Sequence, residues 1–345
     1  MAFYDGLFDS LGLREWCDTS EAGGPMTMEQ LLAQSRGEDA DAAGSELLPF
    51  PSLDNLHASC GEVPPTRDLT SGVEQLFLDV KDGLKIVLDP LTQPLSWMLD
   101  GALFLFTTLP WWLIIPLLIW LTWYVSRSRG VTAFVAITFL FLSFIDHYEA
   151  AIQTLAIIFV CTGLCVALGV PIGILMSKNN TLQRIIIPIL DLLQTLPSFV
   201  YLIPLIFLFS VTESKLYGIA IILYAIVPVI RLTDLGIRLV DKDVIEAANA
   251  FGMTARQKLF GVEIPLALPN IMAGVNQTIM MSLAMVVIAS LVSAPGLGVL
   301  VLRGIRNLEL GVGLIAGLGI VLLAVVLDRA SKAALARVNL AHDNR

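Results

Sequence analysis

Two aromatic residues close to two prolines form a stretch suited to binding an organic cation. Residues 194–204 read QTLPSFVYLIP. Phe199 and Tyr201 offer aromatic faces, which attract quaternary ammonium groups through cation–π interactions. Pro197 and Pro204 break the helix, and broken helices at membrane depth are tolerated where they line a cavity. The stretch therefore predicts a cavity for a cation, with a kinked packing helix as the alternative.

Amide side chains in a later apolar stretch are the other candidates for a substrate pathway. Asn276 and Gln277 follow Ala273 and Gly274. Small residues let helices approach closely and amides form hydrogen bonds across them, so helix packing is the competing interpretation. The residues assigned to a substrate pathway are Gln194, Thr195, Pro197, Phe199, Tyr201, Asn276 and Gln277.

Groups able to catalyse a reaction or bind a metal are scarce. The sequence has no G-x-x-x-x-G-K-[ST] motif for holding the phosphates of ATP. Its three histidines lie far apart, and Cys161 and Cys165, four residues apart in an apolar stretch, favour packing over metal binding. Asp191 is the main charge within the apolar segments, and it is either a functional carboxylate or the partner of a nearby cation. We therefore expect no enzymatic activity, no metal and no cofactor in this chain.

A charged segment at 241–265, DKDVIEAANAFGMTARQKLFGVEIP, separates two long apolar blocks. It predicts two short helices joined at Gly252, because glycine ends a helix at little conformational cost. Asp243 is expected to cap the first helix with Glu246 as its reciprocal partner, and Thr254 to cap the second with Gln257 in the same role. The segment is either a docking element for another protein or an ordinary amphipathic connector.

The composition is that of a membrane protein rather than a soluble domain. Hydrophobic residues make up 56% of the 345 residues, and the mean hydropathy is +0.78. The net charge of −9 is unevenly spread, since residues 1–109 carry −13 and residues 110–345 carry +4. The membrane part is only mildly basic, so nucleic-acid binding has no support.

About seven membrane helices are expected at about 20 residues a span. They are placed at 108–126, 131–146, 150–176, 185–210, 215–232, 267–293 and 309–328. Lys and Arg are concentrated in alternate connections, including the charged segment, so the positive-inside rule places that segment and the C-terminus in the cytoplasm. The N-terminus is then periplasmic. Arg303 and Arg306, on the outer side, are either an exception or part of a docking surface for an external protein.

The chain is expected to divide into an N-terminal arm, an interfacial helix, a transmembrane domain and a short cytoplasmic tail. Their limits are 1–94, 95–109, 110–330 and 331–345. The acidic arm is expected to be partly disordered or to carry short surface helices, and its apolar residues at 71–89 have the helical spacing typical of a membrane interface. Cys17 and Cys60 lie in the arm, and whether they pair is left open.

The charged segment resembles the EAA loop of ABC importer permeases. It has the run Glu246-Ala247-Ala248, then Gly252, then Val262-x-Ile264-Pro265. The family's motif is EAA, three residues, Gly, nine residues and then I-x-L-P, so Val262 and Ile264 depart mildly from it. The resemblance implies a coupling helix that sits in a groove of an ATPase subunit. The coupling residues it implies are Glu246, Ala247, Ala248, Phe251, Gly252, Ile264 and Pro265.

Residues from about 110 to 330 resemble the permease subunit of the glycine betaine/proline betaine family of ABC importers. The likeness is carried by the EAA loop, QTLPSFVYLIP at 194–204, PNIMAGVNQT at 269–278, SLAMVVIAS at 282–290 and GLGVLVLRGI at 296–305. It implies an all-α type I importer permease fold in a bacterial inner membrane. It also implies transport of a methylated-amine osmolyte: glycine betaine, proline betaine, choline, carnitine or trimethylamine N-oxide.

The same resemblance implies the partners and the mechanism. The partners are a second copy of this chain, two cytoplasmic subunits that bind ATP and Mg, a periplasmic substrate-binding protein and membrane lipid. The mechanism is alternating access, driven by the ATPase through the EAA loop. An ion-coupled secondary transporter of small osmolytes is the alternative, but it should show internal repeats and several paired intramembrane charges, and neither is clear.

Overall fold

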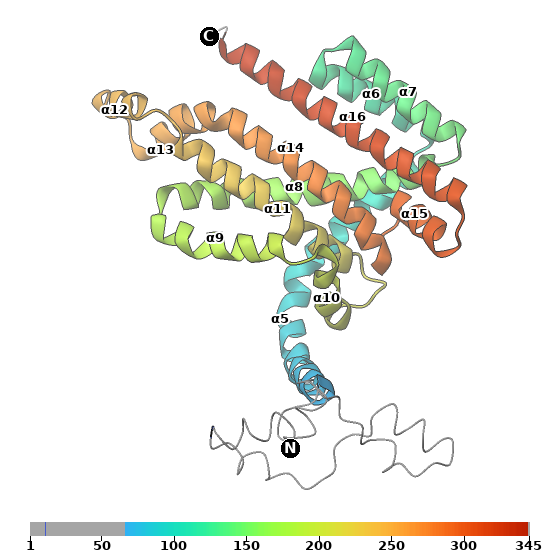
Figure 1. Ribbon diagram of the computed structural model, residues 1–345. Coiled ribbons are helices and arrows are strands. Elements are labelled where there is room, and N and C mark those ends of the chain that lie inside the picture. Colours follow the sequence, from blue (N-terminus) through green and yellow to red (C-terminus); the bar gives the residue numbers. More distant parts are fainter. Residues whose placement is uncertain (1–10, 12–65, 344–345) are drawn as a thin grey trace, which may run out of the picture. The chain divides into compact units, whose positions relative to one another are not determined.

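The computed structural model describes residue 11 and residues 66–343, and over the latter the chain is helical throughout, with short connections (Figure 1). The helices are α5 (Thr66–Thr108), α6 (Trp111–Ser126), α7 (Arg129–Phe144), α8 (Tyr148–Lys178), α9 (Asn180–Thr195), η1 (Ser198–Tyr201), α10 (Leu202–Leu208), α11 (Ser214–Arg238), α12 (Lys242–Ala250), α13 (Ala255–Lys258), η2 (Leu259–Glu263), α14 (Ile264–Ala289), η3 (Ser290–Val292), α15 (Leu297–Arg306) and α16 (Leu310–Asp343). The interpretations placed on the rest of residues 1–65, including the pairing of Cys17 and Cys60, lie outside the described residues.

Four helical runs in the described part of the chain are long and apolar enough to cross a membrane. They are α8, α11, the run that contains α14, and α16. Two bent pairs add two more if each counts as one span: α5 with α6, bent by 111°, and α9 with η1 and α10, bent by 104°. Helix α7 is apolar but has 16 residues, fewer than the about 20 that a span needs. The all-helical membrane fold is thus confirmed, with four to six candidate spans where seven were expected.

Helix α11 packs between α8 and α14, and glycines on those two helices let the backbones approach closely. A Cβ at Gly173 of α8 would lie 2.6 Å from the Cβ of Thr233 on α11. A Cβ at Gly274 of α14 would lie 3.1 Å from the Cα of Val229 on α11. Small residues allow such contacts between membrane helices. The packing interpretation of Gly274 is therefore confirmed.

Replacing Gly173 with alanine is expected to destabilise the bundle by about 1–3 kcal/mol, because the added methyl overpacks the contact between α8 and α11. Gly163→Ala on the same helix is the matched control, since a Cβ at Gly163 would have no heavy atom within 4 Å. Thermal unfolding of the purified protein in lipid nanodiscs measures both variants. Equal melting temperatures would contradict the close packing at Gly173.

Helix α5 is a single helix of 43 residues. It contains both the segment at 71–89 and the helix expected at 95–109, so no break in the helix marks the boundary placed after residue 94. The chain divides into two compact units, Met1–Leu84 and Lys85–Arg345, and the expected domain limits stay predictions. The expected interfacial positions of the α5 segments stay predictions.

Within the second unit, the C-terminal part of α5 is joined to the start of α11. A Cβ at Gly218 of α11 would lie 2.6 Å from Cδ1 of Leu99 on α5. The Nζ of Lys215 lies 2.7 Å from a carboxylate oxygen of Asp89 on α5 and 2.7 Å from one of Glu213. Lys215 is buried, and its pair with Asp89 joins the two helices together with a hydrogen bond from the Ser214 hydroxyl to Asp100.

Candidate coupling site and transport pathway

The first helix of the charged segment, α12, begins at Lys242 and is capped by Asp241. The carboxylate of Asp241 accepts a hydrogen bond from the backbone N–H of Asp243 at 2.9 Å. The expected cap by Asp243 is therefore wrong, because the helix begins two residues earlier than that cap requires and leaves Asp243 in its first turn. Glu246 then lies too far along the helix to complete a capping box, and its side chain is exposed.

Gly252 follows the end of α12, as predicted. Its φ is +72°, in the left-handed region that glycine adopts without strain. The backbone N–H groups of Gly252 and Met253 donate to the carbonyls of Asn249 and Ala248 at 3.0 and 3.1 Å. No heavy atom lies within 4 Å of the place that a Cβ of Gly252 would occupy. The chain thus leaves the space beside this turn open to a partner.

The second helix of the segment, α13, begins with the predicted capping box. The hydroxyl of Thr254 accepts from the N–H of Gln257, and the side-chain carbonyl of Gln257 accepts from the N–H of Thr254 at 2.9 Å. Lys258 Nζ donates to Asn249 Oδ1 at 3.0 Å, which joins α13 to α12. The two helices are therefore held as one unit, which we call the coupling segment (residues 241–263).

The coupling segment exposes several large apolar side chains among its polar ones. Its exposed large side chains are Val244, Phe251, Met253 and Phe260, with Phe251 87% exposed. Of the residues assigned to coupling, Glu246, Ala247, Phe251 and Gly252 are exposed, Ala248 is buried, and Ile264 and Pro265 are half-buried at the start of α14. Exposed apolar surface of this kind is typical of a protein-binding site. The docking role of the segment stays a prediction.

The broken helix predicted around Pro197 is present. Helix α9 ends at Thr195, and the chain bends by 104° into η1 and α10. The break expected at Pro204 is absent, because Pro204 lies in the first turn of α10, where the missing N–H of proline is tolerated. Tyr201 is buried, and its hydroxyl donates to the backbone carbonyl of Leu193 across the bend. Tyr201 therefore braces the bend. Of the other residues assigned to a pathway here, Gln194, Thr195, Pro197 and Phe199 are exposed.

Asn276 lies at the contact between α14 and α16. Its Nδ2 donates to Asp328 at 3.1 Å, and the hydroxyl of Ser331 donates to its Oδ1 at 2.5 Å. The packing interpretation is thus confirmed for Asn276, while Gln277 is exposed. Two cavities, of about 230 and 240 Å³, are lined by residues of α7, α8, α14 and α16 and include none of the residues assigned to a pathway. The pathway assignment stays a prediction.

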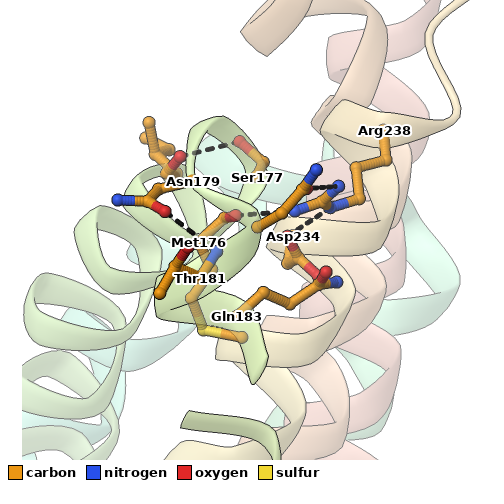
Figure 2. A network of polar contacts seen from close by, with 9 residues as sticks. Met176, Ser177, Asn179, Thr181, Gln183, Asp234 and Arg238 are labelled. Carbon is orange, nitrogen blue, oxygen red and sulfur yellow. Dashed lines mark hydrogen bonds and ion pairs between the residues drawn. The ribbon is translucent and has the colours of Figure 1, made fainter. Parts of the chain in front are cut away.

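A polar network that was not predicted from the sequence lies at the C-terminal end of α11 (Figure 2). Asp234 and Arg238 of α11 bind the end of α8 and the start of α9. Asp191 of α9 pairs with Arg231 of α11, which is one of the two interpretations left open for Asp191. The available signal was the four-residue spacing of Asp234 and Arg238, which places them on one helix face.

Arg303 and Arg306, the two arginines expected on the outer side, differ in their contacts within the chain. Arg303 Nε lies 3.1 Å from a carboxylate oxygen of Glu309. The side-chain amide of Asn307 donates to Glu309 at 3.0 Å and, with Arg303, holds the pKa of Glu309 below its ordinary value. Arg306 is exposed. A docking role for Arg303 and Arg306 stays a prediction.

No group of three or more His, Cys, Asp or Glu able to hold a metal occurs in the described part of the chain. Cys161 and Cys165 are buried free thiols of α8. Their predicted packing role is confirmed by this burial.

Residues 169–339 match the family model described as the binding-protein-dependent transport system inner membrane component. The glycine betaine transport system permease protein OpuAB of Bacillus subtilis is 46% identical over 210 residues, which cover 61% of this chain and 73% of OpuAB. The glycine betaine/proline betaine transport system permease protein ProW of Escherichia coli is 38% identical over 289 residues, 82% of this chain and 78% of ProW. The chain belongs to the glycine betaine/proline betaine family of ABC importer permeases.

The fold of this permease agrees with its family. It is similar to a solved structure described as inward facing conformations of the MetNI methionine ABC transporter, with a TM-score of 0.50 and 21% identity over 56% of the permease and 95% of that chain. The permease is a multi-pass protein of the plasma membrane and is not itself catalytic, since ATP is bound by a partner ATPase. Because the chain belongs to this family, the alternative of an ion-coupled secondary transporter is wrong.

Replacing Tyr201 of the permease with phenylalanine tests the role of the hydroxyl independently of the aromatic ring. The change removes one hydrogen bond, worth about 0.5–1.5 kcal/mol, and keeps the ring. We expect the initial rate of substrate uptake to fall about two- to tenfold in Tyr201→Phe. Uptake by reconstituted complexes measures it, with Tyr148→Phe on α8 as the control, because the Tyr148 hydroxyl has no hydrogen-bond partner among the described residues. An unchanged rate would show that the contact with Leu193 does not matter for transport.

Proposed function

We propose that this permease imports a methylated-amine osmolyte, with glycine betaine as the first candidate substrate. The relatives OpuAB and ProW are described as permeases for glycine betaine, or for glycine betaine and proline betaine, and they support this substrate class. Choline, carnitine and trimethylamine N-oxide are the other members of the class proposed. The aromatic side chain of Phe199, exposed at the helix break, offers a face to such a cation.

The observation that carries the proposed coupling role is the open turn at Gly252 beside the exposed ring of Phe251. In the proposed complex this surface of the coupling segment sits in a groove of the ATPase. A partner shifts a conformational equilibrium only if it binds the two states with different affinity. We propose that closure of the ATPase on ATP supplies this difference and moves the coupling segment.

The proposed assembly contains two copies of the permease, two ATPase subunits and a periplasmic binding protein. The coupling segment and the C-terminus face the cytoplasm, and the N-terminal arm faces the periplasm. The concentration of Lys and Arg in alternate connections supports this orientation.

Reconstitution of the complete complex in liposomes tests the proposed function. Uptake of radiolabelled glycine betaine, proline betaine, choline, carnitine and trimethylamine N-oxide is measured with and without internal ATP. We expect saturable uptake of glycine betaine that requires both ATP and the binding protein and survives the collapse of ion gradients. Failure to transport any of the five compounds would contradict the substrate class.

A further inference from the structure

Helix α11 carries a buried carboxylate close to the coupling segment. Asp234 is 6% exposed and accepts two side-chain hydrogen bonds, from Arg238 Nε at 2.9 Å and from Gln183 Nε2 at 2.7 Å. Gln183 belongs to α9, so this carboxylate joins α9 to α11. A buried charge is unfavourable unless it is paired and hydrogen-bonded, and both contacts meet that need.

The guanidinium of Arg238 extends the contact to a third helix. Its Nη1 donates to Oδ1 of Asn180, the first residue of α9, at 2.8 Å. Its Nη2 donates to the backbone carbonyl of Met176, in the last turn of α8, at 2.7 Å. Figure 2 shows Arg238 reaching from α11 toward the turn between α8 and α9. A planar guanidinium can bind three acceptors in fixed directions, whereas the ammonium of lysine is a compact point charge without that geometry.

The turn between α8 and α9 also contacts the far end of the coupling segment. Lys178, the last residue of α8, pairs with Glu263, the last residue of η2. Glu263 is 4% exposed. Asn179, which lies between α8 and α9, caps α9: its side-chain oxygen accepts from the N–H groups of Thr181 and Leu182. The residues around this turn are therefore bonded to α11, which enters the coupling segment, and to Glu263, the last residue of that segment.

Helix α9 connects this turn to the broken helix. Asp191 of α9 pairs with Arg231 of α11, which gives these two helices a second contact besides that of Gln183 with Asp234. Helix α9 then ends at Thr195, and the chain bends at Pro197. A movement of the turn between α8 and α9 therefore acts directly on the bend.

We propose that Asp234 and Arg238 are positioning residues for energy coupling. With Lys178 and Glu263, they fix both ends of the coupling segment to the turn between α8 and α9. Displacement of the coupling segment then moves α9 as a rigid body and changes the bend at Pro197. This inference rests on the proposed function, because it takes the coupling segment to be the part that binds the ATPase.

Arg238→Lys tests the proposal while keeping the charge beside Asp234. The single nitrogen of lysine cannot stand in the three positions from which Nε, Nη1 and Nη2 reach Asp234, Asn180 and Met176, so the contact that Arg238 makes with α8 and α9 together is lost. We expect the variant to assemble with the ATPase in normal amount and to hydrolyse ATP. The glycine betaine transported per ATP hydrolysed should fall about tenfold, within the range by which residues along a coupling route act.

Lys332→Gln is the matched control. Lys332 forms the same kind of pair on α16, four residues after Asp328 and 2.8 Å from its carboxylate, which also accepts from an amide side chain. It has no contact with the turn between α8 and α9, so the ratio of transport to hydrolysis should stay at the wild-type value. An equal loss in Lys332→Gln would overturn the proposal, because any disturbed ion pair would then uncouple the complex.

Gln183→Ala keeps the pair between Asp234 and Arg238. It removes only the hydrogen bond that the side chain of Gln183, on α9, donates to Asp234. We expect a loss of about threefold in transport per ATP, and a double variant with Arg238→Lys no worse than Arg238→Lys alone, because both act on one joint. A wild-type ratio in both single variants, or losses that only follow the amount of assembled complex, would overturn the proposal. The proposed function fails in a different way: the wild-type permease would then not co-purify with the ATPase.

Discussion

Gly252→Val is expected to leave the permease in the membrane and to reduce ATP-driven uptake about tenfold or more. The turn requires φ = +72°, and a β-branched residue is a genuine outlier there. The left-handed conformation costs a residue with a Cβ about 1–2 kcal/mol. A penalty of this size lowers the ratio of the native turn to other conformations about 5- to 30-fold. The ring of Phe251 and the side chain of Met253 then no longer present the same surface to the ATPase.

Gly252→Asn separates the conformational requirement from the approach of a partner. Asparagine enters the left-handed region more readily than other residues, and within the chain its Cβ has no neighbour within 4 Å. If only the backbone conformation matters, Gly252→Asn keeps most of the uptake that Gly252→Val loses. If the ATPase approaches the turn closely, both variants lose transport and ATPase co-purification. Normal uptake by Gly252→Val would contradict the assignment of this turn to coupling.

The features that the sequence predicted correctly are those whose signal is local. Gly252, the capping box at Thr254 and the break at Pro197 each depend on a residue's own backbone preference or on a partner three residues away. Even here the start of α12 was misplaced, because Asp241 and Asp243 are both good caps. Only the backbone at Asp241, which is not helical, decides between them.

The features that the sequence did not predict depend on contacts between distant residues. An aromatic residue such as Tyr201 could face a cavity or the protein interior, and nothing in its neighbours in sequence fixes which. Its hydroxyl binds Leu193 because the bend brings two consecutive helices together. Asp234 and Arg238 likewise gain their role from Gln183 and Met176, which lie more than fifty residues earlier.

The ion pair at the start of α11 likewise joins residues that are far apart in the sequence. Lys215 meets Asp89, 126 residues earlier, together with its near neighbour Glu213. The side chain of Lys215 is only 5% exposed, whereas those of Asp89 and Glu213 are 35% and 34% exposed. Removing the carboxylates therefore leaves a buried charge, while removing the ammonium leaves two carboxylates that water can reach.

The double variant Asp89→Ala and Glu213→Ala is expected to destabilise the permease by about 3 kcal/mol. Breaking a buried ion pair by removing one side costs about 3–5 kcal/mol. The ring of Phe209, whose centre lies 5.1 Å from Lys215 Nζ, offsets part of this. Lys215→Met should cost much less, because an apolar side chain of similar size fills the site without a charge. Thermal unfolding in nanodiscs compares the variants.

The triple variant, which adds Lys215→Met to the double variant, decides whether burial of the charge is the cause. If the lost stability comes from an ammonium left without carboxylates, removing that ammonium restores most of it. If it comes instead from lost packing between α5 and α11, the triple variant is no more stable than the double variant. A double variant as stable as the wild type would show that Lys215 reaches water when its partners are gone. The ion pair would then contribute little to holding α5 on α11.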